Sequence, residues 1–421
     1  MQHFCACLKN GVRVIIVPML GNPTITIFAG TDTGSLHEDA EHNGISHFLE
    51  HLYFKGSTNH SDTQKLLEEL DVLGTNYNAF TSYETTACHL TTRSVNAGKA
   101  IDLVSDLYIN QLLRSSDIEN ERGVICGEID MYNDDPGTWD TGALLRIMYG
   151  DQPAGRSVLG TKENVERFSR SDFVAYRKAN YTAETTFVVI AGGISIVAAL
   201  QMLESSHFAG IARTPRISPL SPHKVTTGLT VEYLLDSTEQ THICLGFEAH
   251  PVGHADTHIV RVINAVLSGG MSARIFRRMR TELGLGYDAS GSAELYRYYG
   301  MYGAAAGVDS RRAEVGIYEL ARVCMSVARE RVSDRELTIA REVVANNVVL
   351  ETSDQVAGFY AGQEINGLPL QTPEEKLVRI NTVTADDILR VAGGIFTPDN
   401  LHVVVVGPEP RGDPSKLFQN L

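Results

Sequence analysis

An internal repeat restricts the fold of this 421-residue chain more than any other feature. Residues 179–192 (ANYTAETTFVVIAG) align with residues 394–407 (GIFTPDNLHVVVVG) at an offset of 396 − 181 = 215, which places Phe396 opposite Tyr181. Each copy reads as the end of a helix, a short turn and an apolar, β-branched strand. The repeat therefore predicts two similar halves.

The expected fold class is α+β, with each half an antiparallel β-sheet covered by α-helices. Strand-like runs at 12–17 and 24–28, together with long helical patterns, support this class. A Pro-rich stretch at 214–222 (TPRISPLSP) separates the copies of the repeat and is typical of a linker. We expect domains at 1–213 and 228–421, joined by a linker at 214–227.

Two histidines and a glutamate lie within the five residues HFLEH at 47–51. An α-helix turns about 100° per residue, so His47 and His51 share one face and Glu50 lies on the same side. Both imidazoles can then reach one metal ion. Gly56 is expected to stop this helix, which would place the motif in mid-helix. An isolated histidine pair fits a solvated helix face equally well, but the intervening Glu50 favours a metal site.

Catalytic zinc usually takes three protein ligands, so the pair predicts a third one elsewhere. The segment 116–129 opens with a Ser-x-x-Glu capping box at Ser116 and Glu119, which predicts a helix. Glu121 and Glu128 are seven residues apart, or two turns, so both carboxylates face the same way. The pattern leaves open which of them would bind the metal and which would support the site.

With this spacing the chain resembles the inverzincin metallopeptidases, the family of pitrilysin, insulin-degrading enzyme and the mitochondrial processing peptidase with its small bacterial relatives. In that family the H-x-x-E-H motif is followed, about 75 residues later, by Glu-x6-Glu. In this chain Glu128 lies 128 − 51 = 77 residues beyond His51. The resemblance implies one zinc ion per chain, bound by His47, His51 and Glu128. It also implies that Glu50 is the catalytic base and that Glu121 supports the ligands.

The resemblance extends over nearly the whole chain. Residues 73–82 (LGTNYNAFTS) resemble the strand against which the family lays its substrate backbone, which implies substrate-binding roles for Asn78, Ala79 and Phe80. Residues 155–161 (GRSVLGT) and 181–183 (YTA) resemble two further family signatures.

The second half carries no copy of the metal motif. The offset of 215 places His47, Glu50 and His51 opposite three residues without ligand atoms: Val262, Ala265 and Val266. The second half is thus expected to keep the helix and to lack the metal.

The second half instead contains residues 280–287 (RTELGLGY), which resemble the R-x-x-x-G-x-x-Y segment of the family. By this resemblance Arg280 and Tyr287 reach the catalytic site from the opposing half of a clamshell, where they would stabilise the developing oxyanion. Taken alone, the segment also fits an ordinary helix end.

The long members of the family have four such units in one polypeptide, whereas this chain has two. The opposing half is therefore expected from a second subunit, most simply in a homodimer that acts in trans; a heterodimer stays open.

Charge and composition limit the kinds of partner and the cellular location that are expected for this protein. The net charge of −15, from 36 basic and 51 acidic residues, argues against nucleic acid. The sequence contains no run of about 20 apolar residues, so it predicts no membrane-spanning helix. The six cysteines form no C-x-x-C pair and the first residues do not resemble a targeting peptide, so a cytoplasmic location is expected.

The expected function is a zinc-dependent endopeptidase that hydrolyses unstructured peptides inside a chamber formed by two subunits. The alternative is a non-catalytic scaffold or peptide-binding subunit that needs a partner chain for activity. Scaffold members of the family usually have a degraded motif, so the intact set of His47, Glu50, His51 and Glu128 favours the enzyme.

Overall fold

The computed structural model describes residues 2–134, 139–215, 225–235, 240–286, 288–408 and 418. The chain forms two compact units, each built from separate stretches of sequence. Unit 1 contains Met1–Asp130, Arg156–Ser221 and Leu350–Thr372, and unit 2 contains Met131–Gly155, Pro222–Val349 and Pro373–Leu421.

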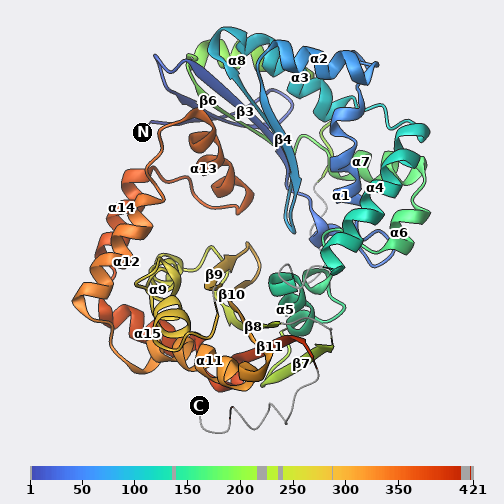
Figure 1. Ribbon diagram of the computed structural model, residues 1–421. Coiled ribbons are helices and arrows are strands. Elements are labelled where there is room, and N and C mark those ends of the chain that lie inside the picture. Colours follow the sequence, from blue (N-terminus) through green and yellow to red (C-terminus); the bar gives the residue numbers. More distant parts are fainter. Residues whose placement is uncertain are drawn as a thin grey trace. The chain divides into compact units, whose positions relative to one another are not determined.

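The centre of unit 1 is a six-stranded sheet with the strand order β1-β2-β6-β3-β5-β4 (Figure 1). Its strands are β1 (Phe4–Cys7), β2 (Arg13–Pro18), β3 (Thr24–Thr31), β4 (Asn76–Thr81), β5 (Thr86–Arg93) and β6 (Thr186–Gly192). Neighbours pair antiparallel, except β2 and β6, which pair parallel. The sheet is therefore mixed rather than wholly antiparallel, because the long helical segment between β5 and β6 lets the chain return in the same direction as β2.

Helices cover both faces of this sheet. Its helices are α1 (Ile45–His51), α2 (Thr63–Val72), α3 (Ala97–Ile109), α4 (Ser115–Asp134, which continues into unit 2), α6 (Lys162–Arg167), α7 (Arg170–Asn180), α8 (Ile196–Glu204) and α13 (Ser353–Ile365). Side chains alternate along β3: Ile25 and Ile27 join the core beneath α1, α3 and α8, whereas Phe28 packs with α13 on the other face.

Unit 2 has a five-stranded sheet with the order β7-β11-β8-β10-β9. Its strands are β7 (Thr230–Leu235), β8 (Gln240–Ala249), β9 (Ala289–Leu295), β10 (Gly300–Asp309) and β11 (Leu401–Gly407). Here too one pair, β7 with β11, is parallel. Its helices are α5 (Trp139–Tyr149), α9 (Thr257–Ser268), α10 (Arg274–Phe276), α11 (Ala313–Arg329), α12 (Asp334–Asn346), α14 (Pro373–Thr382) and α15 (Ala385–Ile395).

The repeat expected from the sequence is present in both units. Strands β6 and β11 start at 186 and 401, and helices α7 and α15 start at 170 and 385, so both offsets are 215. Helix α9 is the counterpart of α1 and carries the three equivalent residues, all buried: Val262, Ala265 and Val266. The α+β class with two similar halves is confirmed.

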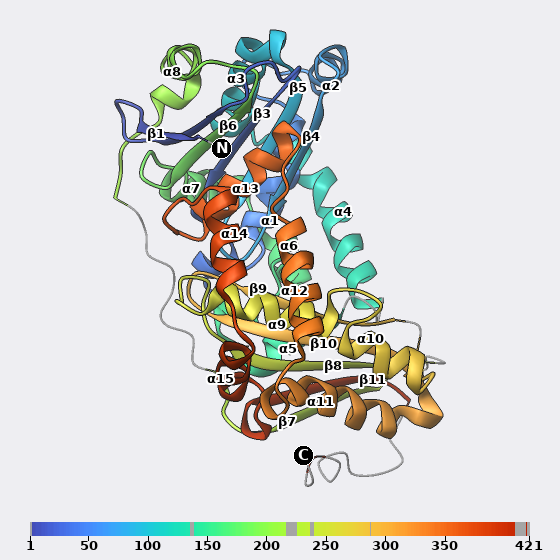
Figure 2. The same ribbon diagram turned by 90° about the vertical axis from the view of Figure 1, so that its left-hand side faces the viewer.

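One helix from each half packs on the sheet of the other. Helix α13 comes from the second half but covers β2, β3 and β6 of unit 1, where Val356 and Tyr360 are fully buried. Helix α5 comes from the first half and packs against β8, β10 and β11 of unit 2 (Figure 2). The domain boundaries at 213 and 228 stay a prediction, and the compact units differ from them in these exchanged segments. Much of the expected linker, 216–224, lies outside the described residues.

Within the described residues, no helix combines the length and the apolar character needed to cross a lipid bilayer.

Candidate metal centre

Helix α1 begins at a buried carboxylate. Glu38 accepts hydrogen bonds from the backbone N–H groups of Gly44 and Ser46, both at 2.8 Å, and from the side chain of Asn43 at 3.2 Å. These are N–H groups that the first turn of a helix leaves without partners. Burial raises the pKa of Glu38, and the hydrogen bonds oppose that rise. The sequence analysis missed Glu38, because neither helical spacing nor a motif connects it to α1.

The first residue before α1 has to be glycine. Gly44 has a φ of 100°, and a Cβ atom there would lie 2.7 Å from the carbonyl oxygen of Leu159 and 2.8 Å from Cα of Gly160. The segment 155–161, which the sequence analysis singled out, thus packs directly against the start of the helix with the histidines.

The helix is shorter than expected. It ends at His51, and a 3₁₀ turn, Tyr53–Lys55, follows before Gly56, whose φ is 119°. The motif therefore occupies the last turns of α1, and the prediction of a mid-helix position was wrong. The non-helical φ and ψ of Phe54 mark a kink within this turn.

Three side chains converge at the end of this helix. Oε2 of Glu128 lies 3.5 Å from Nε2 of His47 and 3.3 Å from Nε2 of His51. Each of the three residues offers a ligand atom within 4.8 Å of the other two. Oε2 of Glu128 is buried and has no hydrogen-bond partner.

These separations fit a zinc ion. Zinc–ligand distances of about 2.0–2.2 Å in a tetrahedral site place neighbouring ligand atoms about 3.3–3.6 Å apart. Burial, with a smaller contribution from His51, lowers the pKa of His47 to about 4, so this imidazole is neutral at pH 7. A neutral imidazole keeps the nitrogen lone pair that a metal needs. The geometry and the chemistry of the donors thus both suit the metal.

Glu121 stands behind His51 rather than beside the ligand atoms. Its Oε2 lies 3.2 Å from Nδ1 of His51, and its Oε1 forms an ion pair with Lys55. A hydrogen bond from Nδ1–H leaves the Nε2 lone pair of His51 directed at Glu128. Of the two glutamates whose roles the spacing left open, Glu128 thus lies beside both Nε2 atoms, and Glu121 lies against Nδ1 of His51.

The helix that carries both glutamates confirms one detail of the sequence pattern and contradicts another. Helix α4 buries Ile118 and Ile125 in the core of unit 1, about 60° around the helix from Glu121 and Glu128. It begins at Ser115, so Ser116 is already inside the first turn, and Glu119 pairs with Arg122 at 2.9 Å instead of closing a capping box.

Glu50 lies on α1 between the two histidines, and Thr81 at the end of β4 hydrogen-bonds to it. Burial raises the pKa of Glu50, the bonds to Thr81 and the proximity of His51 lower it, and the net shift is upward. A second contact joins the same elements, since Oγ1 of Thr81 donates to the carbonyl oxygen of Ser46 at 3.4 Å.

Strand β4 is an edge of the unit 1 sheet, as the resemblance implied. It pairs with β5, with Asn78 opposite His89. Asn78 is exposed, Phe80 is partly buried and Ala79 is buried. The strand thus presents backbone groups beside the helix that carries Glu50.

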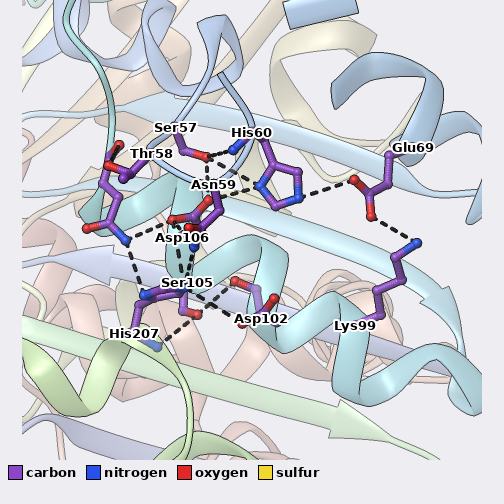
Figure 3. Close-up of polar contacts among 11 residues, drawn as sticks. Ser57, Thr58, Asn59, His60, Glu69, Lys99, Asp102, Ser105, Asp106 and His207 are labelled. Carbon is purple, nitrogen blue, oxygen red and sulfur yellow. Dashed lines mark hydrogen bonds and ion pairs between the residues drawn. The ribbon is translucent and has the colours of Figure 1, made fainter. Parts of the chain in front are cut away.

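A network of polar side chains anchors the loop after α1 (Figure 3). Asp106 of α3 is fully buried and accepts hydrogen bonds from Ser57, from Nδ1 of His60 at 2.9 Å and from Asn110 at 2.8 Å. The other ring nitrogen of His60 lies 3.2 Å from Glu69. The network holds the loop after α1 against the core of unit 1.

The pair expected in the second half is only partly described. Arg280 lies in the short helix Arg277–Glu282, with its guanidinium 5.1 Å from the ring centre of Phe276. Tyr287 lies outside the described residues.

Unit 2 has a second group of possible ligands that the sequence analysis did not find. His250, His254 and Asp256 each offer an atom within 4.8 Å of the others. Arg390 already binds both oxygens of Asp256, each at 2.9 Å, so the carboxylate is engaged in an ion pair.

Comparison with known proteins identifies the class. Residues 21–162 match the family model of insulinase, peptidase family M16, and residues 167–344 match that of the peptidase M16 inactive domain. The chain belongs to this M16 peptidase family, which confirms the resemblance to insulin-degrading enzyme and its relatives.

Several relatives are similar over nearly their full length. An uncharacterized zinc protease of Bacillus subtilis is 29% identical over 396 residues, covering 93% of this chain and 95% of its own. One from Mycobacterium tuberculosis strain H37Rv is 29% identical over 423 residues, covering 98% and 94%. A protease from Helicobacter pylori has the same fold, with a TM-score of 0.89, 19% identity and coverage of 97% of this chain and 99% of that one.

Proposed function

We propose that this protein is a zinc-dependent endopeptidase whose metal is held by His47, His51 and Glu128. The observation that carries the proposal is the approach of Oε2 of Glu128 to both Nε2 atoms, at distances suited to a tetrahedral ion. The naming of the similar bacterial proteins as zinc proteases supports the choice of metal.

Glu50 is the general base of the proposed reaction. Bound zinc would polarise the scissile carbonyl group and lower the pKa of a water molecule. Glu50 accepts a proton from the attacking water and later donates it to the leaving amine nitrogen. Burial, which raises the pKa of its carboxyl group, favours this second role. Glu121 holds His51 in the tautomer that presents Nε2.

The substrate is an extended, unstructured peptide. Its backbone would add to the free edge of β4 near Asn78, Ala79 and Phe80, where main-chain hydrogen bonds give affinity without a strong sequence demand. Thr81 ends this strand and contacts Glu50, so a peptide laid along the edge would lead to the base.

We further propose a homodimer, in which Arg280 and Tyr287 of the partner subunit stabilise the oxyanion. The support is the presence of the metal residues and of the Arg/Tyr segment in the same two-unit chain. The cytoplasmic location expected from the sequence also stays a prediction.

The test is hydrolysis of a mixed library of unstructured peptides by the purified protein and by Glu50→Gln, read by mass spectrometry. Zinc content is measured on both samples. We expect cleavage by the parent only, with equal zinc in both. Absence of cleavage by either protein at stoichiometric zinc would contradict the stand-alone enzyme and favour a subunit that needs a partner chain.

A further inference from the structure

A second concave site lies in unit 1 beside α7. One face of α7 contacts α1, and the site lies on a different face. On the face that contacts α1, the hydroxyl group of Tyr176 hydrogen-bonds to that of Ser46 at 2.8 Å, and the ring of Phe173 packs at a tilt against that of Phe48. The other face lines a pocket of about 300 Å³. Its walls come from α7, from the segment after α3 and from residues 210–212.

Two residues of the lining carry buried polar atoms that have no partner within the described residues. Gln111 is only 7% exposed, and neither its amide oxygen nor its amide nitrogen has a hydrogen-bond partner. Nε of Arg177 is likewise buried and unpaired. A buried polar group without a partner destabilises the fold, so such groups usually mark a bound water, ion or ligand.

The charged side chains that line the pocket are all positive. Its described lining contains three cations and no carboxylate: Arg170, Arg177 and Lys178. Arg177 donates from Nη2 to the carbonyl oxygens of Tyr108 and Ile109, which ends α3, yet it forms no ion pair within the described residues. Burial lowers the pKa of Arg177 below its ordinary value. Within the described part of the chain, this cation thus has no carboxylate as its counter-ion.

The rest of the lining is mostly apolar. It comprises Ile109, Leu113, Val174, Ile211 and Ala212, with Tyr181 at 5.6 Å from the Arg177 guanidinium. A volume of 300 Å³ is at the lower end for small-molecule sites and corresponds to roughly ten water molecules.

We propose that this pocket binds a small organic oxyanion, a carboxylate or phosphate group on a compact apolar body. The anionic oxygens accept hydrogen bonds from Lys178 and, once the two buried side chains turn toward the pocket, from Nε of Arg177 and the amide nitrogen of Gln111; the body packs on the aliphatic walls. The site is separate from the metal centre and does not depend on the proposed peptidase activity.

The test uses two probes on the full-length protein at low ionic strength: hexanoate for the carboxylate and phenyl phosphate for the phosphate. Binding is measured by isothermal titration calorimetry and as a rise in Tm, with 1-hexanol as the neutral match of hexanoate. We expect at least one anion to bind and the alcohol not to. The anion that binds, or binds more tightly, identifies the head group.

Two substitutions locate the binding. Lys178→Gln should weaken the affinity about tenfold, because a hydrogen bond to a charged group is lost. Gln111→Leu should weaken it to a similar extent while leaving the Tm of the ligand-free protein unchanged or higher, since a buried amide without partners is removed. Lys65→Gln, at an exposed position on α2, is the matched control and should bind as the parent does.

The proposal is overturned if neither anion binds, if hexanol binds as tightly as hexanoate, or if both substitutions leave the affinity of the parent. In each case the unpaired groups are satisfied by water alone.

Discussion

The two nitrogens of His51 face two different carboxylates: Nδ1 lies 3.2 Å from Glu121, and Nε2 lies 3.3 Å from Glu128. The two glutamates are separated by two turns of α4, and the ring spans the interval between them. One imidazole thus lies between two carboxylates, so the role proposed for each glutamate can be tested separately.

Glu121→Gln should lower the affinity for zinc by about 10–100-fold, because the hydrogen bond that orients His51 is weakened while the three ligands remain. The affinity is measured by competition with a chromophoric chelator. Glu119→Gln is the matched control, since Glu119 lies exposed on the same helix and pairs with Arg122. An unchanged affinity in Glu121→Gln would contradict the supporting role.

Glu128→Ala should abolish stoichiometric zinc binding, because a ligand itself is removed and two imidazoles remain. Glu121→Ala should still take up one zinc per chain at saturating metal. Elemental analysis after dialysis against a fixed free-zinc concentration separates the two. The opposite ranking would exchange the roles of the two carboxylates.

Glu38→Gln should destabilise unit 1 by about 1–3 kcal/mol, since one amide group cannot accept from Gly44 and Ser46 as two carboxylate oxygens do. Urea denaturation gives the free energy of unfolding. The exposed Glu41→Gln should change it by less than about 0.5 kcal/mol. Equal stability of the two variants would show that Glu38 does not hold the start of α1.

The hydrogen bonds to Asp106 should make the stability of the fold depend on pH. Burial alone would raise the pKa of Asp106, but hydrogen bonds from Ser57, Asn110 and His60 outweigh this effect and hold the pKa below its ordinary value. A carboxyl group with a depressed folded pKa stabilises the fold fully above its unfolded pKa, about 3.9, and loses this contribution as the pH falls through the folded value.

Asp106→Asn should therefore cost about 3 kcal/mol at pH 7, and the difference from the parent should shrink below about pH 4. Unfolding by urea at a series of pH values measures this difference. Asp102→Asn, on the same helix and 63% exposed, should change stability little at any pH. A difference that stays constant down to pH 3 would rule out ionised Asp106 as the source.

Activity in trans can be tested by mixing two inactive variants, Glu50→Gln and Arg280→Ala. A mixed dimer would contain one site with both an intact Glu50 and an intact Arg280 of the partner subunit, so activity should return. If each chain supplied its own Arg280, the mixture would stay inactive. Exchange of subunits is checked with differently tagged chains.

Features with local periodicity were the ones that the sequence predicted well. The positions of His47, Glu50 and His51 on one helix follow from helical spacing, and the offset of 215 predicted matching elements in the two halves. The end of α1 was placed too late: the helix ends at His51, and a 3₁₀ turn follows before the loop whose Ser57 bonds to Asp106.

The sequence by itself determined the α+β class, the repeat and the residues that can bind a metal, since these depend on side-chain chemistry and on the period of a helix or strand. Only the tertiary structure decided that Glu128 approaches both histidines, that Glu38 supports the start of α1, and that α5 and α13 are exchanged between the halves. The contacts of Glu38 span only six and eight residues, but they depend on the path of the loop before α1. The other two relationships join residues far apart in the chain. Their distances are set by the packing of whole elements, which no local pattern encodes.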